Sequence, residues 1–109
     1  MIHQPDSSNF KELLPGIFMK TLTHGANALL CEFRLTKGTI IPAHQHPQEQ
    51  IGYLVHGSLR LFGDEGESIV ATGSSWCFKG GVIHGAEVLV DSVAVEVFSP
   101  MRLDYLSLK

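Results

Sequence analysis

Two histidines separated by one residue, His44 and His46, are the first residues of this sequence whose types and spacing indicate a chemical function. On an extended segment, side chains at positions i and i+2 point to the same face, about 6.6 Å apart along the strand. Both imidazoles can then converge on one metal ion, because neutral imidazole is a common ligand of divalent transition metals. An HxH pair is frequent by chance, so its weight depends on the residues around it.

The histidine pair lies within a longer pattern through which the chain resembles the cupin family. The first cupin motif, G-x5-HxH-x3-E-x6-G, is matched in every spacing by Gly38, His44, His46, Gln50 and Gly57. Its one departure is Gln50, at the position where most cupins carry glutamate. The second motif, G-x5-P-x-G-x2-H, is matched by Gly73, Gly81 and His84, with Lys79 at the proline position. The resemblance covers roughly residues 10–107.

This resemblance implies both a fold and a metal site. The expected fold class is all-β: a single antiparallel cupin-type β-barrel, which is a jelly-roll-like double-stranded β-helix. One divalent metal ion is expected inside it, held by His44, His46, Gln50 and His84. These neutral ligands leave the ion its full positive charge, so the site should bind metal less tightly than a glutamate site and attract an anionic substrate. Imidazole suits several metals, and Fe, Ni, Zn, Mn and Cu all remain candidates. The alternative is that Gln50 is a surface turn residue and the site holds no metal.

The last third of the chain narrows the resemblance. The segment Asp91–Tyr105 is similar to the C-terminal signature of small single-domain cupins that act in pectin and alginate breakdown and linearise 4,5-unsaturated uronates. In that group an acidic residue on the final strand transfers protons, and an arginine six residues later holds the substrate carboxylate. The matching positions here are Glu96 and Arg102. Glu96 is one methylene longer than the aspartate of the characterised enzymes.

Alternation with period two leaves two orientations open for Glu96. In Ser92–Phe98 the valines share one face, and Ala94, Glu96 and Phe98 share the other. If the valines pack outward, Glu96 points into the barrel, where burial would raise its pKa and a cation would lower it. If the valines fill the core, Glu96 is solvated. Arg102 likewise is either a substrate-binding group or an ordinary surface arginine.

The elements that must position these residues are short strands. Leu29–Leu35 alternates, with its odd positions apolar. Further strands are predicted by β-branched and aromatic content at Ile17–Thr23, Ile51–Val55, Ser58–Phe62, Ser68–Ala71, Trp76–Phe78 and Ala86–Val90. Turn residues separate them, including a hairpin at His56-Gly57, and no helical stripe of ten or more residues is present. A flexible tail over residues 1–9 is expected before one domain over 10–109.

Composition and charge exclude some classes of binding partner. The chain has 109 residues, a formal charge of −3 and no run of Lys and Arg, which argues against nucleic acid. No apolar segment approaches the roughly 18 residues of a membrane span, and no signal peptide is visible, so we expect a cytoplasmic protein with no membrane partner. Cys31 and Cys77 are then expected to be buried free thiols. Open strand edges at Ile17–Leu22 and Leu103–Leu108 predict a homodimer.

Three classes of function stay open at this point. The first is a metal-dependent isomerase or lyase acting on a small, anionic sugar acid, with Glu96 moving the proton and Arg102 holding the carboxylate. The second is an iron-dependent cupin oxygenase. The third is a module that binds a metal or a sugar acid without catalysis. The charge of the site and the Glu96–Arg102 pair favour the first.

Overall fold

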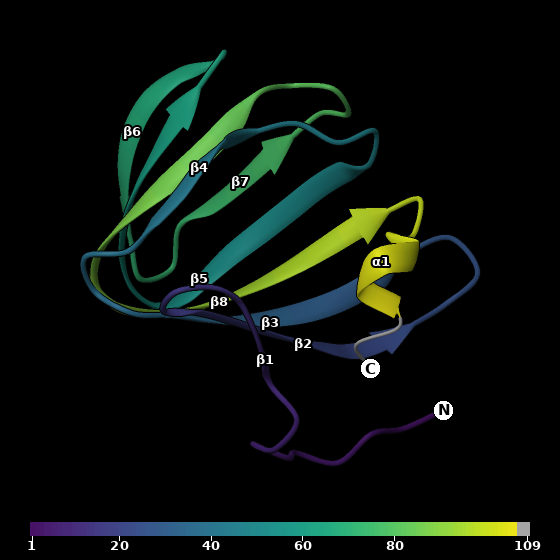
Figure 1. The fold of residues 1–109 in the computed structure, drawn as a ribbon. Coiled ribbons are helices and arrows are strands. Elements are labelled where there is room, and N and C mark those ends of the chain that lie inside the picture. The colour runs from purple at the N-terminus through teal and green to yellow at the C-terminus, as the bar shows by residue number, and fades with distance from the viewer. Residues whose placement is uncertain (107–109) are drawn as a thin grey trace.

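The fold is known from a computed structural model that describes residues 1–106, in which nearly all regular structure is antiparallel β-sheet. The strands in chain order are β1 Lys11–Leu14, β2 Ile17–His24, β3 Leu29–Leu35, β4 Ile40–His44, β5 Glu49–Gly63, β6 Gly66–Ala71, β7 Ser75–Phe78 and β8 His84–Ser99 (Figure 1). The single turn of helix α1, Leu103–Leu106, follows. In residues 1–106 no helix has the length and apolar character that a membrane crossing requires.

Two long strands, β5 and β8, pair with each other and hold the two layers together. The C-terminal half of β8 pairs with β3, and its N-terminal half pairs with β4. Correspondingly, the first half of β5 pairs with β7 and its second half with β6. Each long strand therefore passes from one layer to the other, as Figure 1 shows.

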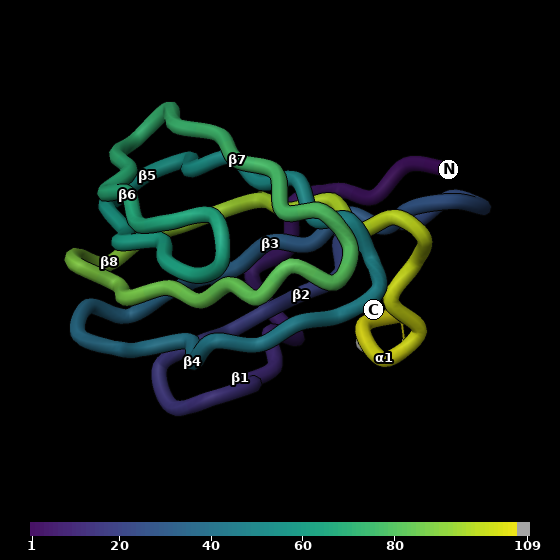
Figure 2. Tube along the Cα trace, turned by 90° about the horizontal axis from the view of Figure 1, so that it is seen from above, coloured from purple at the N-terminus to yellow at the C-terminus, as the bar shows by residue number. Residues whose placement is uncertain are grey.

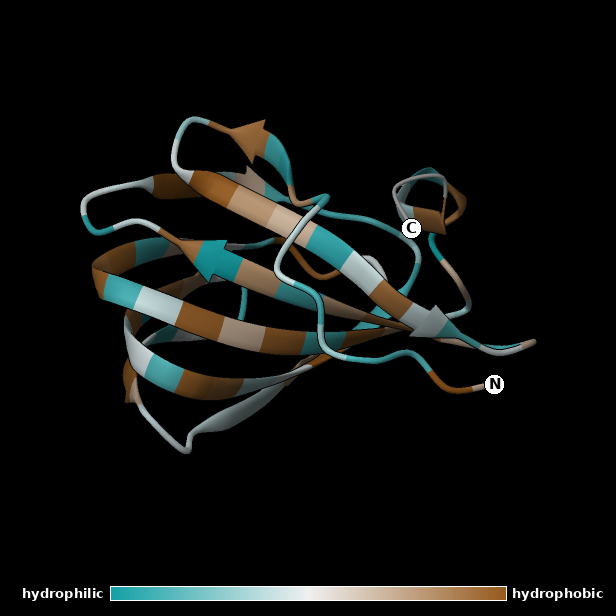
Figure 3. Ribbon diagram, turned by 90° about the horizontal axis from the view of Figure 1, so that it is seen from below, coloured by the Kyte–Doolittle hydropathy of each residue, from teal (hydrophilic) through white to brown (hydrophobic). Residues whose placement is uncertain are grey.

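Alternating side chains build the core between these layers, and the predicted all-β jelly roll is confirmed. In β3 the odd positions Leu29, Cys31, Phe33 and Leu35 are all buried, as the alternation predicts. Figure 3 shows the corresponding alternation of apolar and polar bands along the strands. Among the described strands, β1 and β6 end the strand order and do not pair with each other. The layers therefore form an open jelly roll rather than a closed barrel.

The predicted hairpin at His56-Gly57 is wrong. His56 and Gly57 lie inside β5, which bends there through several register shifts. Gly57 has φ +124°, and a Cβ at this position would overlap Ser92 at the bend of β8. The glycine therefore marks a crossing of two bent strands, not a reversal of the chain. Likewise, Ala86–Val90 and Ser92–Phe98, on either side of Asp91, belong to one continuous strand, β8, and not to two.

One of the two cysteines differs from its expected burial. Both are free thiols, and Cys31 is buried, but Cys77 is exposed. In β7 the side chains of Trp76 and Phe78 turn toward the interior, and alternation therefore places Cys77 on the outer face. Desolvation raises the pKa of the Cys31 thiol to about 12, so this buried group stays protonated.

The strand edges proposed for assembly also need correction. Ile17–Leu22 lies in β2, which pairs with β3 on one side. On the other side β1 pairs only with residues 17–19, so the open edge is shorter than predicted and limited to residues 20–22 of this segment. Leu103–Leu106 forms α1 instead of an edge strand, and residues 107 and 108 lie outside the described residues. Among the described strands, β1 and β6 are the two ends of the strand order.

A homodimer remains a prediction, now through these end strands, because unpaired edges invite strand pairing across a two-fold axis. Light scattering at micromolar concentration should give twice the chain mass of 11.9 kDa. A mass equal to one chain would contradict it.

Candidate functional site

The open side of the jelly roll brings three histidines together. His44 is the last residue of β4, His46 lies in the loop that follows, and His84 begins β8 directly opposite His44. The ring centroids of His44 and His84 are 4.5 Å apart, and that of His46 is 5.1 Å from His84. One nitrogen from each ring lies within 4.8 Å of the others. The two sequence motifs therefore supply one cluster.

The loops that carry the two motifs are tied together by their backbones. The Gly81 N–H donates to the His46 carbonyl at 2.9 Å, and a Cβ at Gly80 would overlap the Pro47 carbonyl. Lys79, at the motif's proline position, still closes the turn by accepting from the Val82 N–H at 3.1 Å. The departure from the motif therefore leaves His84 in place.

Backbone carbonyls orient each imidazole of the cluster. His44 Nδ1 lies 2.8 Å from the carbonyl oxygen of Pro42, and His46 Nδ1 lies 3.0 Å from that of Gln48. His84 Nδ1 makes the same contact with Val82 at 2.9 Å. A carbonyl oxygen only accepts, so each Nδ1 carries the proton and each Nε2 carries a lone pair. This is the tautomer that a metal-binding histidine needs.

Gln50, buried on the inner face of β5, completes the cluster. Its Nε2 donates to Glu96 Oε2, which fixes the amide so that Oε1 faces the histidines. Oε1 lies 3.0 Å from His46 Nε2 and 3.1 Å from His84 Nε2. Sequence reasoning offered a surface turn as the alternative for this residue, whereas its side chain points into the jelly roll.

The donor set fits a divalent cation. Three Nε2 lone pairs and an amide oxygen converge on one point. Because each neutral imidazole carries its proton on Nδ1, neither His46 Nε2 nor His84 Nε2 can donate a hydrogen bond to Gln50 Oε1. Burial lowers the pKa of His46 and of His84, which favours neutral imidazoles over imidazolium ions. Facing lone pairs at such distances repel one another unless a positive charge lies between them, and three histidines with one oxygen ligand suit a transition metal.

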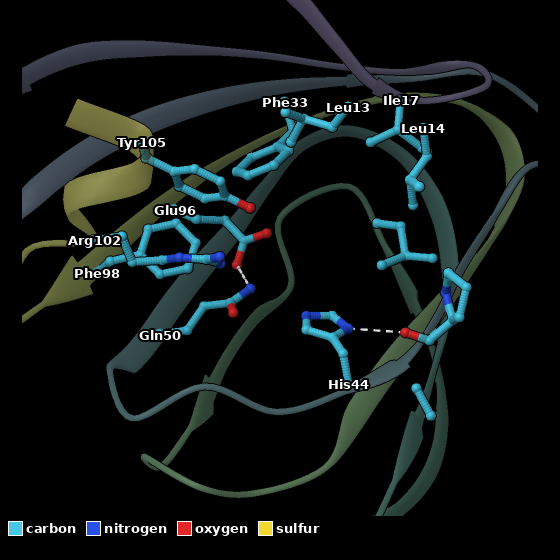
Figure 4. Close-up of a pocket in the computed structure, with 13 residues that line it drawn as sticks. Leu13, Leu14, Ile17, Phe33, His44, Gln50, Glu96, Phe98, Arg102 and Tyr105 are labelled. Atoms are coloured by element: carbon cyan, nitrogen blue, oxygen red, sulfur yellow. Dashed lines mark hydrogen bonds between the residues drawn. The ribbon is translucent and has the colours of Figure 1, made fainter. Parts of the chain in front are cut away.

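Glu96 lies beside this cluster, on the inner face of β8. Of the two orientations left open by the sequence, the structure has Ala94, Glu96 and Phe98 buried and the valines turned outward. Glu96 Oε2 accepts from Gln50 and from the Trp76 indole N–H at 3.3 Å. Burial raises the pKa of the Glu96 carboxyl to about 7, and the two donated hydrogen bonds act in the opposite direction. The other carboxylate oxygen points into a cavity (Figure 4).

Arg102 reaches the same cavity from the segment after β8. Its side chain is 16% exposed and forms an ion pair with Asp104 at 2.9 Å. The guanidinium carbon lies 3.8 Å from the ring centre of Tyr105 and 5.2 Å from that of Phe98. These stacking contacts hold the guanidinium plane against the cavity wall.

The cavity itself has a volume of about 370 Å³ and lies between β1 and β4. Figure 1 shows these strands in different layers, and Figure 2 shows them along the same side of the molecule. His44, Gln50, Glu96 and Arg102 line one part of it. The other part is apolar and includes residues from β1 to β4 that sequence reasoning missed: Leu13, Leu14, Ile17, Phe33 and Ile41.

Sequence reasoning gave no role in the site to three aromatic residues that lie near it. Tyr105 lines the cavity, and desolvation raises its pKa to about 12. Phe78 stacks on His84 with ring centroids 4.4 Å apart and planes 8° apart. The Trp76 indole N–H donates a hydrogen bond to Glu96. The sequence signal that could have indicated this contact is Gly52, because a glycine inside a strand often marks the close approach of another group.

Comparison with known proteins agrees with this geometry. The cupin domain family model matches residues 31–99. Among curated proteins no match was found. Among solved structures, KdgF from Halomonas sp. is 28% identical with a TM-score of 0.82, over 87% of this chain and 90% of that one.

Two further structures support the fold. A RmlC-like cupin from Shewanella frigidimarina NCIMB 400 has a TM-score of 0.86 at 21% identity, over 96% of each chain. An oxalate decarboxylase variant from Bacillus subtilis has a TM-score of 0.69 at 25% identity, over 78% of this chain but only 26% of that one. With the family match spanning more than half of its length and both motifs meeting in one histidine cluster, the chain belongs to the cupin domain family.

Proposed function

We propose that this cupin is a metal-dependent enzyme that acts on a small sugar acid, by opening and isomerising 4,5-unsaturated uronates. One observation carries the proposal: the metal cluster, a carboxylate and a guanidinium line the same cavity, through His44, Gln50, Glu96 and Arg102. The similarity to KdgF from Halomonas sp. supports it, together with the resemblance of the last third of the chain to the cupins that linearise unsaturated uronates. A divalent ion bound to the cluster would supply the Lewis acidity that polarises substrate oxygens.

Arg102 provides the recognition of the substrate carboxylate. A guanidinium offers several N–H donors in one plane, which match the two oxygens of a carboxylate. Its Nε and Nη2 donate to Asp104, at 3.4 Å and 2.9 Å. The stacking on Tyr105 presents the remaining donors in a fixed orientation. The bound substrate would thus be anchored at one end of the cavity.

Glu96 provides the proton transfer. Its Oε2 is engaged by Gln50 and Trp76, and its Oε1 points into the cavity, where it can take up and return a proton. In ring opening, the C1 hydroxyl loses a proton, the bond from C1 to the ring oxygen breaks, and that oxygen gains a proton as an enol at C5. The enol then loses its O–H proton while C4 gains one, which yields the ketone. No atom is gained or lost overall, so one carboxylate can serve both steps.

The deciding experiment is an assay of the metal-loaded protein on 4,5-unsaturated galacturonate and mannuronate. Loss of the unsaturated chromophore should proceed well above the spontaneous rate. A rate no higher than the spontaneous one would contradict the proposal. Oxygen consumption by the iron-loaded protein would then indicate the cupin oxygenase, and tight binding without turnover would indicate a non-catalytic module.

Replacing Arg102 by lysine tests the anchoring of the substrate. Because an ammonium cannot reproduce the planar two-point contact, Arg102→Lys should raise KM by about 10-fold or more with a smaller change in kcat. Steady-state kinetics on the preferred uronate would measure both constants. An unchanged KM would remove Arg102 from substrate binding.

A further inference from the structure

Three residues on adjacent strands form a row beside the metal cluster. Gly52 on β5 lies in register with Trp76 on β7 and with Glu96 on β8. All three positions belong to the inner face of their strands. A Cβ at Gly52 would overlap the Trp76 indole, so the indole occupies the space that a side chain on β5 would fill. This gap lets the Trp76 N–H cross β5 and reach Glu96.

The row continues into the metal ligands through hydrogen bonds. Trp76 Nε1 donates to Glu96 Oε2, and the same oxygen accepts from Gln50 Nε2. The amide oxygen of Gln50 is thereby left facing His46 and His84. Trp76 makes no hydrogen bond to a histidine in this chain of contacts. It is connected to the Gln50 amide through two hydrogen bonds that share Glu96 Oε2.

The orientation of the Gln50 amide decides whether its oxygen can act as a metal ligand beside the three histidines. If the amide turned over, its two N–H groups would face the Nε2 lone pairs of His46 and His84 and would satisfy them as donors. The lone pairs of these two histidines would then be hydrogen-bonded to Gln50 and less available to a metal ion. Glu96 Oε2 prevents this because a carboxylate oxygen accepts and does not donate, and it must stay aimed at Gln50 to do so.

We propose that Trp76, seated over Gly52, is a positioning residue that holds Glu96 Oε2 and so keeps the Gln50 amide oxygen turned toward the metal. The inference rests on the metal centre of the proposed function. The alternative is a purely structural tryptophan, since the N–H of an enclosed indole usually finds some acceptor. Only the positioning role requires that metal binding change when the N–H is lost.

Two variants remove the hydrogen bond by different routes. Trp76→Phe keeps an aromatic ring but has no N–H donor. Gly52→Ala keeps the tryptophan but displaces its indole, because the added Cβ would overlap it. Gly25→Ala is the matched control, since a Cβ at Gly25 meets nothing within 4 Å. Folding of each variant is checked first by metal-free thermal unfolding.

The measurement is titration of each metal-free variant with Co²⁺ alone, followed by both calorimetry and visible absorption. Loss of a residue that orients a metal ligand typically weakens binding by about 10–100-fold, and we expect each of the two variants to lose about 10-fold. Their Co²⁺ absorption should shift toward that of Gln50→Ala, which lacks the amide ligand. The double variant should bind no worse than the weaker single one, because both changes remove the same hydrogen bond.

Three results would overturn the inference. Wild-type Co²⁺ affinity and spectrum in Trp76→Phe would make the tryptophan structural only, and so would weaker binding with an unchanged spectrum. A wild type that binds no Co²⁺ would overturn the inference together with the metal centre. Since no sugar enters this test, a protein that binds Co²⁺ as expected but converts no uronate would contradict the proposed activity alone.

Discussion

Glutamine in place of Glu96 is expected to reduce turnover of 4,5-unsaturated uronates by about 10²–10⁴-fold, the usual contribution of a positioned proton-transfer group. The amide oxygen of the new glutamine can still accept from Gln50 and from Trp76, so the ligand set keeps its orientation. What is lost is the carboxylate oxygen that points into the cavity. Initial rates of chromophore loss, with metal content measured on the same samples, check this result.

Glu96→Ala serves as the comparison for that variant. It removes both the proton-transfer group and the acceptor for Gln50, so it should reduce metal affinity by about 10–100-fold as well as turnover. The two variants together separate the role of the carboxylate in proton transfer from its role in orienting Gln50. Equal turnover by the wild type and Glu96→Gln would exclude Glu96 from the proton transfer.

Removal of a histidine ligand should have the second large effect. His84 is buried at the centre of the cluster, within 3.1 Å of Gln50 Oε1 and opposite His44 on the paired strand. His84→Ala, and likewise His44→Ala, should abolish stoichiometric metal, because each removes one of four converging donors. The free energy of unfolding should also fall, since metal at 100 times its Kd adds about 2.7 kcal/mol to the folded state.

The matched control is His56→Ala, because His56 is exposed on β5 and lies outside the cluster. Metal analysis of the purified variants and thermal unfolding with and without added metal provide the two readouts. His56→Ala should keep both properties of the wild type. A wild type that purifies without metal and gains no thermal stability from any of several divalent ions would show that the site is wrongly assigned.

The ligand set also has an electrostatic consequence for substrate choice. Three neutral imidazoles and a neutral amide cancel none of the charge of a bound cation, so the cavity would attract anions. The carboxylate of Glu96 accepts a hydrogen bond from Gln50, so it would orient this metal ligand without binding the metal itself. Arg102 lines the same cavity and pairs with Asp104 at 2.9 Å, so it adds oriented hydrogen-bond donors there rather than a full second positive charge. This arrangement supports a small anionic substrate.

The sequence by itself determined the fold class and the identity of the four converging donors. Alternating apolar residues in Leu29–Leu35 and Ser92–Phe98 are a local property of strands, and a period of two can be seen without the fold. The resemblance of two spaced motifs to those of the cupin family implied one cluster of His44, His46, Gln50 and His84, and the structure brings these residues together. The role of each in metal binding stays a prediction.

Only the tertiary structure decided how the strands run and what stands behind the ligands. His56-Gly57 has the composition of a turn, yet Ser92 packs against Gly57 from another strand and the chain continues through it. The side of β8 that carries Glu96 depended on which face met the opposite layer, because alternation alone permits both faces to be buried. The contact of Trp76 with Glu96 across Gly52 joins three strands, and the apolar half of the cavity joins β1 to β4. Such contacts depend on strand register between distant segments, which no local pattern in the sequence specifies.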